Sequence, residues 1–178
     1  MRKILIIFFV MVASQYISLA QKYGIGTDIL ALTCGTINFD ASLMLSKNIT
    51  LHLPFSWNPV TLRNNYKIKH LATQPGVRWW FWHGYSELFL GANLISSMFN
   101  IAVSNDRKQG WAVGASLSLG YAWMMTDRIN LEIEAGAGPL YTEYDRFAKE
   151  ACGDYLGTKK GFIFFPTCFS CSLVYILN

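Results

Sequence analysis

The chain has 178 residues, of which 52% are hydrophobic, 15% aromatic and only 15% charged, and its formal net charge is +4. A typical soluble domain carries about 25% charged residues, so this composition argues against an ordinary soluble enzyme surface and against a long disordered tail. The length allows one domain, or at most a small pair.

The beginning of the chain has the layout of a secretory signal peptide. Arg2 and Lys3 precede an apolar run over residues 4–13, and small residues follow at the expected cleavage site. The run is too short for a transmembrane helix, which needs about 20 apolar residues. We therefore expect export, with removal of residues 1–20 and a mature domain over residues 21–178. Without the two basic residues the formal charge falls to +2. A nucleic-acid partner is not expected, because it would require a concentrated basic face.

Beyond the signal, apolar residues recur with a period of two. Residues 37–45, 49–57, 111–123 and 129–137 each alternate in this way. Successive side chains of a strand point to opposite faces, so each segment has one large apolar face and one mostly small or polar face. No later run approaches the length of a membrane helix. Eight strands are predicted, near residues 24–33, 36–45, 49–58, 71–82, 86–99, 110–124, 129–143 and 162–177.

The character of the two faces separates a membrane barrel from a soluble β-sandwich or lipocalin-like barrel. In residues 111–123 the face opposite the large apolar side chains consists of Gly, Ser and Ala. A soluble outer surface would be richer in Lys and Glu, whereas a membrane barrel turns its apolar face to lipid and its small or polar face to the lumen. Tryptophans near the strand ends match two interfacial girdles. One girdle would hold Trp57 and Trp111, and the other Trp79, Trp80, Trp82 and Trp123.

The predicted connections alternate in length. Residues 46–48, 83–85 and 126–128 are short, residues 58–70, 100–109 and 144–161 are longer, and residues 34–35 are a short exception among the latter. Outer-membrane barrels have short periplasmic turns and longer external loops. The sequence therefore predicts an all-β fold: a single eight-stranded antiparallel transmembrane β-barrel in the Gram-negative outer membrane, in contact with outer-membrane lipid.

Several segments also carry a resemblance to a known family. They are residues 69–81 (KHLATQPGVRWWF), 110–123, 128–132, 144–147, 152–153 and 166–167. Over nearly the whole mature chain, they resemble a family of small outer-membrane barrels of the Bacteroidetes. That family is a domain of unknown function, often encoded near fimbrial genes. The resemblance implies a location and a fold, without an established activity.

Charged residues expected inside the barrel are the best functional clue. Alternation points Arg78, Glu132 and Glu134 into the lumen, and Glu87 and Asp28 are expected to join them. Charges inside a narrow barrel must be paired or hydrated, so we expect a structural network that fills the lumen. The alternative is a proton or ion path. Glycosidase chemistry is disfavoured, because the two glutamates lie two apart on one strand and the reaction needs a sugar between its carboxylates.

The cysteines suggest at most one disulfide. Cys34 and Cys152 fall in predicted external loops, and closure of the barrel makes the first and last strands neighbours. A disulfide between them is one alternative in an exported protein, and free thiols are the other. Cys168 and Cys171 form a C-x-x-C pattern. Residues three apart on a strand face opposite sides, which disfavours a zinc or redox site.

No sequence motif points to catalysis. Nucleotide, metalloprotease and serine-hydrolase motifs are absent, and His52, His70 and His83 fall at separate places. We expect no enzymatic activity and no cofactor. The predicted function is a structural, adhesion or assembly-accessory role for a monomeric barrel whose external loops contact surface or fimbrial proteins. The alternatives are a membrane-embedded lipid-modifying enzyme on an eight-stranded barrel, and a narrow pore.

Overall fold

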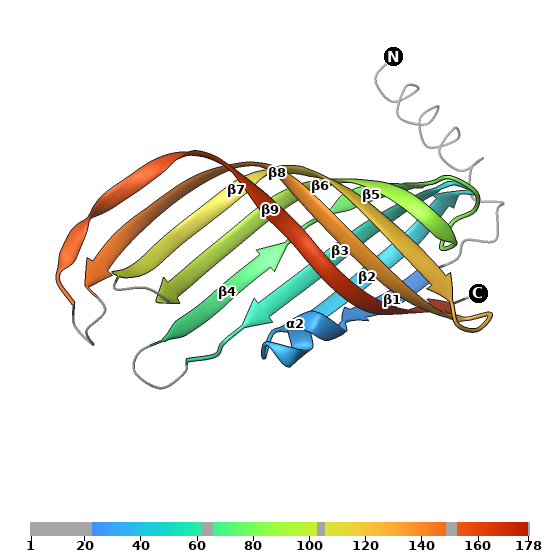
Figure 1. Cartoon of the computed structure of the whole chain (residues 1–178), viewed down its shortest axis with the longest axis horizontal. Helices are drawn as coiled ribbons and strands as arrows, with labels where there is room; N and C mark the ends of the chain where they lie inside the picture. Colours follow the sequence, from blue (N-terminus) through green and yellow to red (C-terminus); the bar gives the residue numbers. More distant parts are fainter. Residues whose placement is uncertain (1–22, 62–65, 103–105, 149–152, 178) are drawn as a thin grey trace, which may run out of the picture.

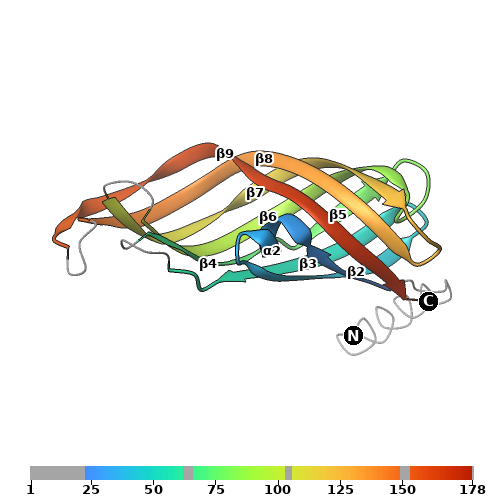
Figure 2. The same cartoon turned by 60° about the horizontal axis from the view of Figure 1, so that its bottom comes forward.

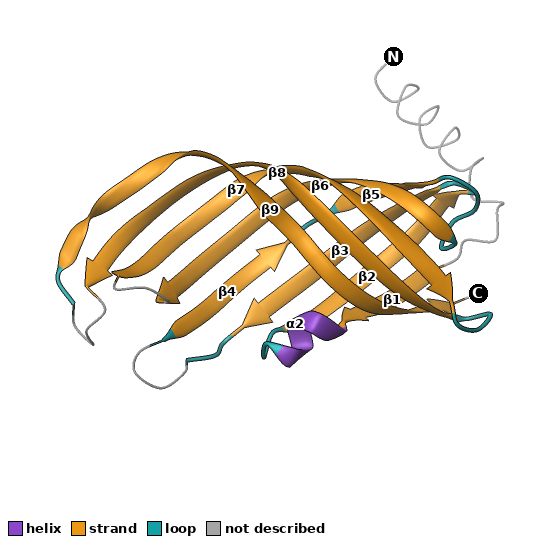
Figure 3. Cartoon of the chain, in the orientation of Figure 1, coloured by secondary structure: helices purple, strands orange, loops and turns teal. Residues whose placement is uncertain are grey.

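Strands make up almost all of the structure. The computed structural model describes residues 23–61, 66–102, 106–148 and 153–177, and the predicted signal peptide lies outside them. Within these ranges the chain forms nine strands and one five-residue helix (Figure 3). No helix in the described part is long and apolar enough to cross a membrane. The prediction of an all-β antiparallel fold is confirmed.

The elements follow one another in an up-and-down order (Figure 1). Their bounds are β1 (Tyr23–Asp28), α2 (Ile29–Thr33), β2 (Ile37–Ser46), β3 (Ile49–Asn58), β4 (Lys67–Thr73), β5 (Gly76–Trp80), β6 (Glu87–Ala102), β7 (Asp106–Met124), β8 (Ile129–Ala148) and β9 (Tyr155–Leu177).

The sheet closes into a ring. The strand order is β2-β1-β9-β8-β7-β6-β4-β3-β5, and further pairings of β2 with β3 and of β6 with β5 join its ends. β4 and β5 each pair with both β3 and β6, so they occupy one position end to end. The single strand predicted over residues 71–82 is therefore two strands, separated at Gln74 and Pro75. A proline cannot donate an amide hydrogen to the ladder, which accounts for an interruption here.

The two ends of the ring carry different connections. At the turn end, residues 47–48, 81–86 and 125–128 connect the strands, and at the loop end β3 is followed by β4, β6 by β7 and β8 by β9. β1 starts and β9 finishes at the turn end, as both views show (Figures 1 and 2). This grouping of the connections at the two ends agrees with the sequence prediction.

Two connections at the loop end are shorter than predicted. β6 and β7 pair as far as Ile101 and Lys108, so residues 100–109 are mostly strand. β8 and β9 likewise pair as far as Phe147 and Tyr155, inside the region predicted as a loop over residues 144–161. The hairpins continue because backbone pairing does not require the apolar alternation on which the prediction rested.

The first strand is also shorter than predicted. It ends at Asp28, and α2 occupies residues 29–33, where a strand was expected. The Asp28 carboxylate accepts a hydrogen bond from the Leu30 amide at 3.0 Å and acts as the N-cap. It also accepts one from the Cys171 amide of β9 at 3.1 Å. The apolar run after Asp28 fits either a strand or a helix, and this cap favours the helix.

Inside and outside have inverted polarity compared with a soluble protein. On β7, Ser116 is 5% exposed and its neighbour Leu117 is 73% exposed. The same alternation holds around the ring. Buried polar residues include Ser42, Thr50, His52, Asn93, Ser118, Asn130 and Thr142, and exposed apolar residues include Leu53, Leu94, Leu119, Phe162, Phe164 and Phe169. Soluble domains bury residues of the second kind and expose those of the first.

Candidate functional site

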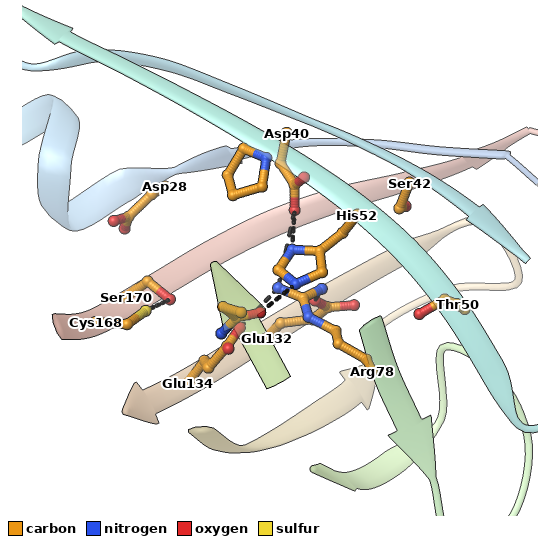
Figure 4. A network of polar contacts seen from close by, with 12 residues as sticks. Asp28, Asp40, Ser42, Thr50, His52, Arg78, Glu132, Glu134, Cys168 and Ser170 are labelled. Carbon is orange, nitrogen blue, oxygen red and sulfur yellow. Dashed lines mark hydrogen bonds and ion pairs between the residues drawn. The ribbon is translucent and has the colours of Figure 1, made fainter. Parts of the chain in front are cut away.

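A cluster of charged side chains lies inside the ring (Figure 4). Arg78 comes from β5, and Glu132 and Glu134 come from β8. Residues two apart on a strand share a face, so both glutamates point inward together. Their strand lies across the ring from β5, with β6 and β7 between them on one side.

Arg78 bridges the two glutamates. One terminal nitrogen, Nη1, donates to Glu132 Oε2 at 3.0 Å, and the other, Nη2, donates to Glu134 Oε2 at 2.7 Å. All three residues are at most 6% exposed. A planar guanidinium can hold two carboxylates in this way, which the single ammonium of a lysine cannot do with the same geometry. The three residues therefore form one buried, charge-assisted unit.

A second group of polar residues extends this unit. Asp40 Oδ2 on β2 lies 3.8 Å from Arg78 Nη2 and 4.0 Å from His52 Nδ1 on β3. His52 Nε2 and Asn93 Oδ1 are 2.8 Å apart, and Asn93 Nδ2 donates to Ser118 Oγ at 3.2 Å. One guanidinium thus faces three carboxyl groups, and the polar contacts involve β2, β3, β5, β6, β7 and β8.

Small inner residues make room for this packing. A side chain at Gly91 would meet Ser118 Oγ at 2.2 Å, and one at Gly120 would meet the Phe89 ring at 2.2 Å. Phe89 in turn lies under the guanidinium, with its ring centroid 4.8 Å from Arg78 Cζ. The alternation of glycine with larger residues therefore lets long side chains cross a narrow interior.

An aromatic cluster fills the ring between the charged residues and the turn end. It contains Trp80, Tyr85 and Phe89, which are at most 2% exposed, and Ala122 and Ile176 pack with them. Trp80 was predicted to lie in an interfacial girdle, and this is wrong. Its indole points inward.

Polar contacts hold these aromatic residues in place. Trp80 Nε1 donates to Thr50 Oγ1 at 3.0 Å, and the Tyr85 and Ser42 hydroxyls are 2.9 Å apart. Tyr85 adopts a φ of 65° in the connection between β5 and β6. The left-handed backbone there is part of the turn from which the Tyr85 side chain enters the interior of the sheet.

On the other side of the charged cluster is a polar cavity of about 260 Å³. Asp40, His52, Arg78 and Glu134 line it, together with Asp28 from the end of β1. Small-molecule sites usually measure roughly 300–1,000 Å³, so this space suits water or a small polar group better than an organic substrate.

Two of the five charged residues predicted for the network lie apart from it. Glu87 is exposed at the first residue of β6, where its φ is 61°, and no described ion pair connects it to Arg78. It lies at the turn end, and Tyr85 and Phe89 fill the interior beside it. Asp28 lines the polar cavity, but its carboxylate binds backbone amides and is absent from the described ion pairs.

Sequence reasoning missed Asp40, His52 and Asn93 as partners in the cluster. Asp40 alternates with the apolar residues of β2. The alternation that predicted an inward Arg78 therefore also predicts an inward Asp40. Asn93 gave no such signal, because an uncharged amide on an inner face has no special pattern. Only the fold shows that it lies between His52 and Ser118.

The cysteines form no described disulfide. Cys34 is an exposed free thiol, and Cys152 lies outside the described residues. Cys168 and Cys171 are half-buried free thiols on β9. Cys168 faces the polar cavity, and Cys171 pairs in the ladder with Ile133, an exposed residue of β8.

The described residues show no arrangement typical of catalysis. Among them, no group of three or more His, Cys, Asp or Glu could hold a metal ion. Asn93 separates His52 from Ser118, so this serine has no histidine as a direct base. Glu132 and Glu134 bind the same guanidinium, which leaves no place for a sugar between them.

Comparison with known proteins supports a family assignment. A family described as "Protein of unknown function (DUF3575)" matches residues 4–177. No curated protein shows significant similarity to the chain. The match confirms the predicted membership of a domain-of-unknown-function family. The Bacteroidetes origin and the fimbrial gene context stay predictions.

Proposed function

We propose that this chain, which belongs to the DUF3575 family of proteins of unknown function, is a small outer-membrane β-barrel with a structural, adhesion or assembly-accessory role. The single observation that carries the proposal is the inverted polarity of the closed sheet. Leu117 and Phe164 are more than 70% exposed on the outside, whereas Glu132 and Glu134 are at most 3% exposed on the inside.

The outer surface of the ring is unfavourable in water. Each large apolar side chain left in water forgoes roughly 1.5–3 kcal/mol of burial free energy. A contiguous patch beyond a few hundred Å² marks a membrane or protein contact, and here exposed apolar residues occur on every strand from β1 to β9. Hydrocarbon covers such a surface on all sides. Where each strand is paired on both sides, the ladder satisfies the other demand of a membrane, since no water is there to bind unpaired backbone groups. The exception in the described part is residues 155–171 of β9, which pair with β8 alone.

Exposed tryptophans are consistent with this placement. Trp57 is 47% exposed near the loop end, and Trp79 and Trp82 are 48% and 54% exposed near the turn end. Indole rings favour the interface between hydrocarbon and water. The part of the outer surface in contact with hydrocarbon would therefore lie between Trp57 on one side and Trp79 and Trp82 on the other. The turn end would face the periplasm.

The filled interior argues against the narrow-pore alternative. The Arg78–Glu132–Glu134 unit and the aromatic cluster of Trp80, Tyr85 and Phe89 occupy successive levels of the ring. Water and ions would have to pass both. Eight strands leave an interior that side chains can fill, so the proposal assigns the network a structural role.

The proposed interaction surface is the loop end. Basic residues predominate among its described side chains: Lys67, Lys69, Arg107, Lys108, Arg146, Lys159 and Lys160, against Asp106, Glu143, Asp145 and Asp154. Loops on a rigid scaffold commonly carry recognition. A basic rim favours acidic partners, so we propose contacts with acidic surface proteins or surface components. Fimbrial proteins are one such class that the family resemblance suggests.

Reconstitution tests the proposal directly. The mature chain, refolded in detergent and mixed with phospholipid vesicles, should float with them in a density gradient and resist carbonate extraction. In a planar bilayer it should give no steady conductance, because the interior is filled. A chain that stays in the aqueous fraction contradicts the membrane location, and a steady ion current contradicts the structural role of the network.

A further inference from the structure

Residues 162–165 in the middle of β9 differ from the other described strands because they are apolar on both faces. Phe162 and Phe164 are 79% and 76% exposed on the outside. Ile163 and Phe165 are 45% and 53% exposed and point to the inside. Elsewhere in the ring, inward residues are mostly polar or small. A strand with this pattern is suited to apolar surroundings on both sides.

The inner face of this segment lines a cavity, here called the apolar chamber. Its volume is about 500 Å³, and its apolar lining includes Ile95, Phe99, Leu140, Ile163 and Phe165. Polar side chains also line it, among them Ser56, His70, Gln74, Thr142 and Thr167. The volume lies within the roughly 300–1,000 Å³ usual for small-molecule sites. Apolar atoms make up most of the surface of the chamber, and such a surface favours apolar ligands over water.

The chamber lies beside an opening in the ring. β9 pairs with β1 only from Ser172 to Leu177, because β1 ends at Asp28. From Tyr155 to Cys171, β8 is the only strand paired with β9 in the described part of the chain. Figures 1 and 2 show α2 beside β9, and β9 continues past α2 toward the loop end. One wall of the chamber, formed by β9, therefore ends at an unpaired strand edge next to the proposed lipid-facing surface.

A positively charged side chain, that of Lys108, lies at the loop end of the chamber. Lys108 lines it, and its Nζ lies 5.8 Å from the centroid of the Tyr144 ring. Lys108 makes no ion pair among the described residues. A largely apolar space with a positive charge in its lining complements a hydrocarbon chain with an anionic head.

We infer that the apolar chamber binds one acyl chain of an anionic lipid, which enters from the bilayer past the unpaired edge of β9, on the loop-end side of α2, and places its head at the loop end near Lys108. The inference rests on the proposed membrane location. It concerns a specific bound lipid, in addition to the annular lipid that any barrel contacts. Ser97 and Ser96 on β6 provide a matched pair for the test, because Ser97 lines the chamber and Ser96 is exposed on the opposite face.

The test uses the mature protein in vesicles that contain phosphatidylglycerol with a photoactivatable acyl chain. Leu140 and Ile95 are 8% and 7% exposed and face the chamber, so labelling at either residue reports a chain inside the ring. We expect labelling at Leu140 and one phosphatidylglycerol retained per chain in native mass spectrometry. A second arm offers a free fatty acid of the same length, which separates a membrane lipid from a free acid as the source.

The variants locate the site. Ser97→Trp should reduce retention and Leu140 labelling by about tenfold or more because the indole occupies the chamber, whereas Ser96→Trp should leave both unchanged. Lys108→Gln should weaken phosphatidylglycerol retention about fivefold and remove the preference over phosphatidylcholine with the same chains.

Several results would overturn the inference. A wild-type protein that floats with vesicles but shows no Leu140 labelling has no acyl chain in the chamber, and the proposed membrane location would survive. Equal labelling of Ser97→Trp and wild type, or crosslinks from β9 to a second copy of the chain in place of lipid, would also refute it. Failure to float would refute the proposed function and the inference together.

Discussion

Arg78 is the residue on which the interior depends most. It holds two buried glutamates at 3.0 and 2.7 Å and lies 3.8 Å from a third carboxylate, that of Asp40. Removing one member of a buried ion pair leaves an uncompensated charge, whereas replacing the whole set with apolar residues can be neutral. The cluster is therefore sensitive to single substitutions.

We predict that Arg78→Leu lowers the free energy of unfolding by about 3–5 kcal/mol, because Glu132 and Glu134 lose their shared partner. Urea unfolding of the refolded protein, followed by tryptophan fluorescence, measures this change. Combining Arg78→Leu with Glu132→Leu and Glu134→Leu should recover much of the loss, and the comparison isolates the coupling among the three residues.

Arg146 provides the matched control. It pairs with Asp106 on a half-exposed surface at the loop end, where ion pairs contribute little. Arg146→Leu should leave the unfolding midpoint close to that of the parent. If Arg78→Leu behaved in the same way but abolished a binding or transport activity, the structural role of Arg78 would be wrong.

At the scale of elements, the strands owe their stability to the surroundings of their two faces. β7 shows this most clearly, since Ser116 and Ser118 are buried and Leu117 and Leu119 are exposed. A charge on the lipid-facing side of a membrane strand must lose its hydration, and the cost depends on depth. A charge on the inner side instead meets the packed interior, so the two faces should respond differently to the same substitution.

Leu117→Arg should destabilise the protein by about 2–4 kcal/mol in vesicles if the residue lies near the midplane of the bilayer. The measurement is denaturant unfolding of vesicle-bound protein, with Leu117→Met as the apolar control. Ser116→Arg should also destabilise, through crowding inside the ring, and its effect should persist in detergent. Parental stability of Leu117→Arg in vesicles would refute the lipid-facing assignment.

At the scale of the whole molecule, the two ends of the ring have different proposed surroundings. The turn end has three tight connections and the end of β9, and the loop end has the basic rim. A barrel inserted from the periplasm keeps its termini and short turns on that side. The proposed orientation therefore predicts that every connection at the turn end faces the periplasm and every connection at the loop end faces the cell exterior.

Cysteine labelling tests this orientation in whole cells. Thr61→Cys at the loop end and Asp127→Cys at the turn end are compared in a background in which the four natural cysteines are replaced by serine. A membrane-impermeant maleimide should label position 61 in intact cells and position 127 only after the outer membrane is opened. The reverse labelling pattern would contradict the proposed topology.

The features that depend on alternation could be predicted from the amino-acid sequence. A period of two is a local property of the backbone, so it predicted the strands, the apolar outer face and the inward direction of Arg78, Glu132 and Glu134. It failed where the chain leaves that period. The α2 helix replaces a predicted strand, and the positions of Trp80 and Glu87 follow from the fold of the turn between β5 and β6.

Tertiary structure alone decided which inner residues meet. Arg78 and Glu132 are 54 positions apart in the chain, and their contact depends on strand order and on the register accumulated around the ring. Alternation contains no information on that register. The same reason applies to the opening beside the apolar chamber, which exists because β1 stops at Asp28 while β9 continues for many residues beyond its last pairing with β1. Neither strand reveals this difference until both are placed in one closed sheet.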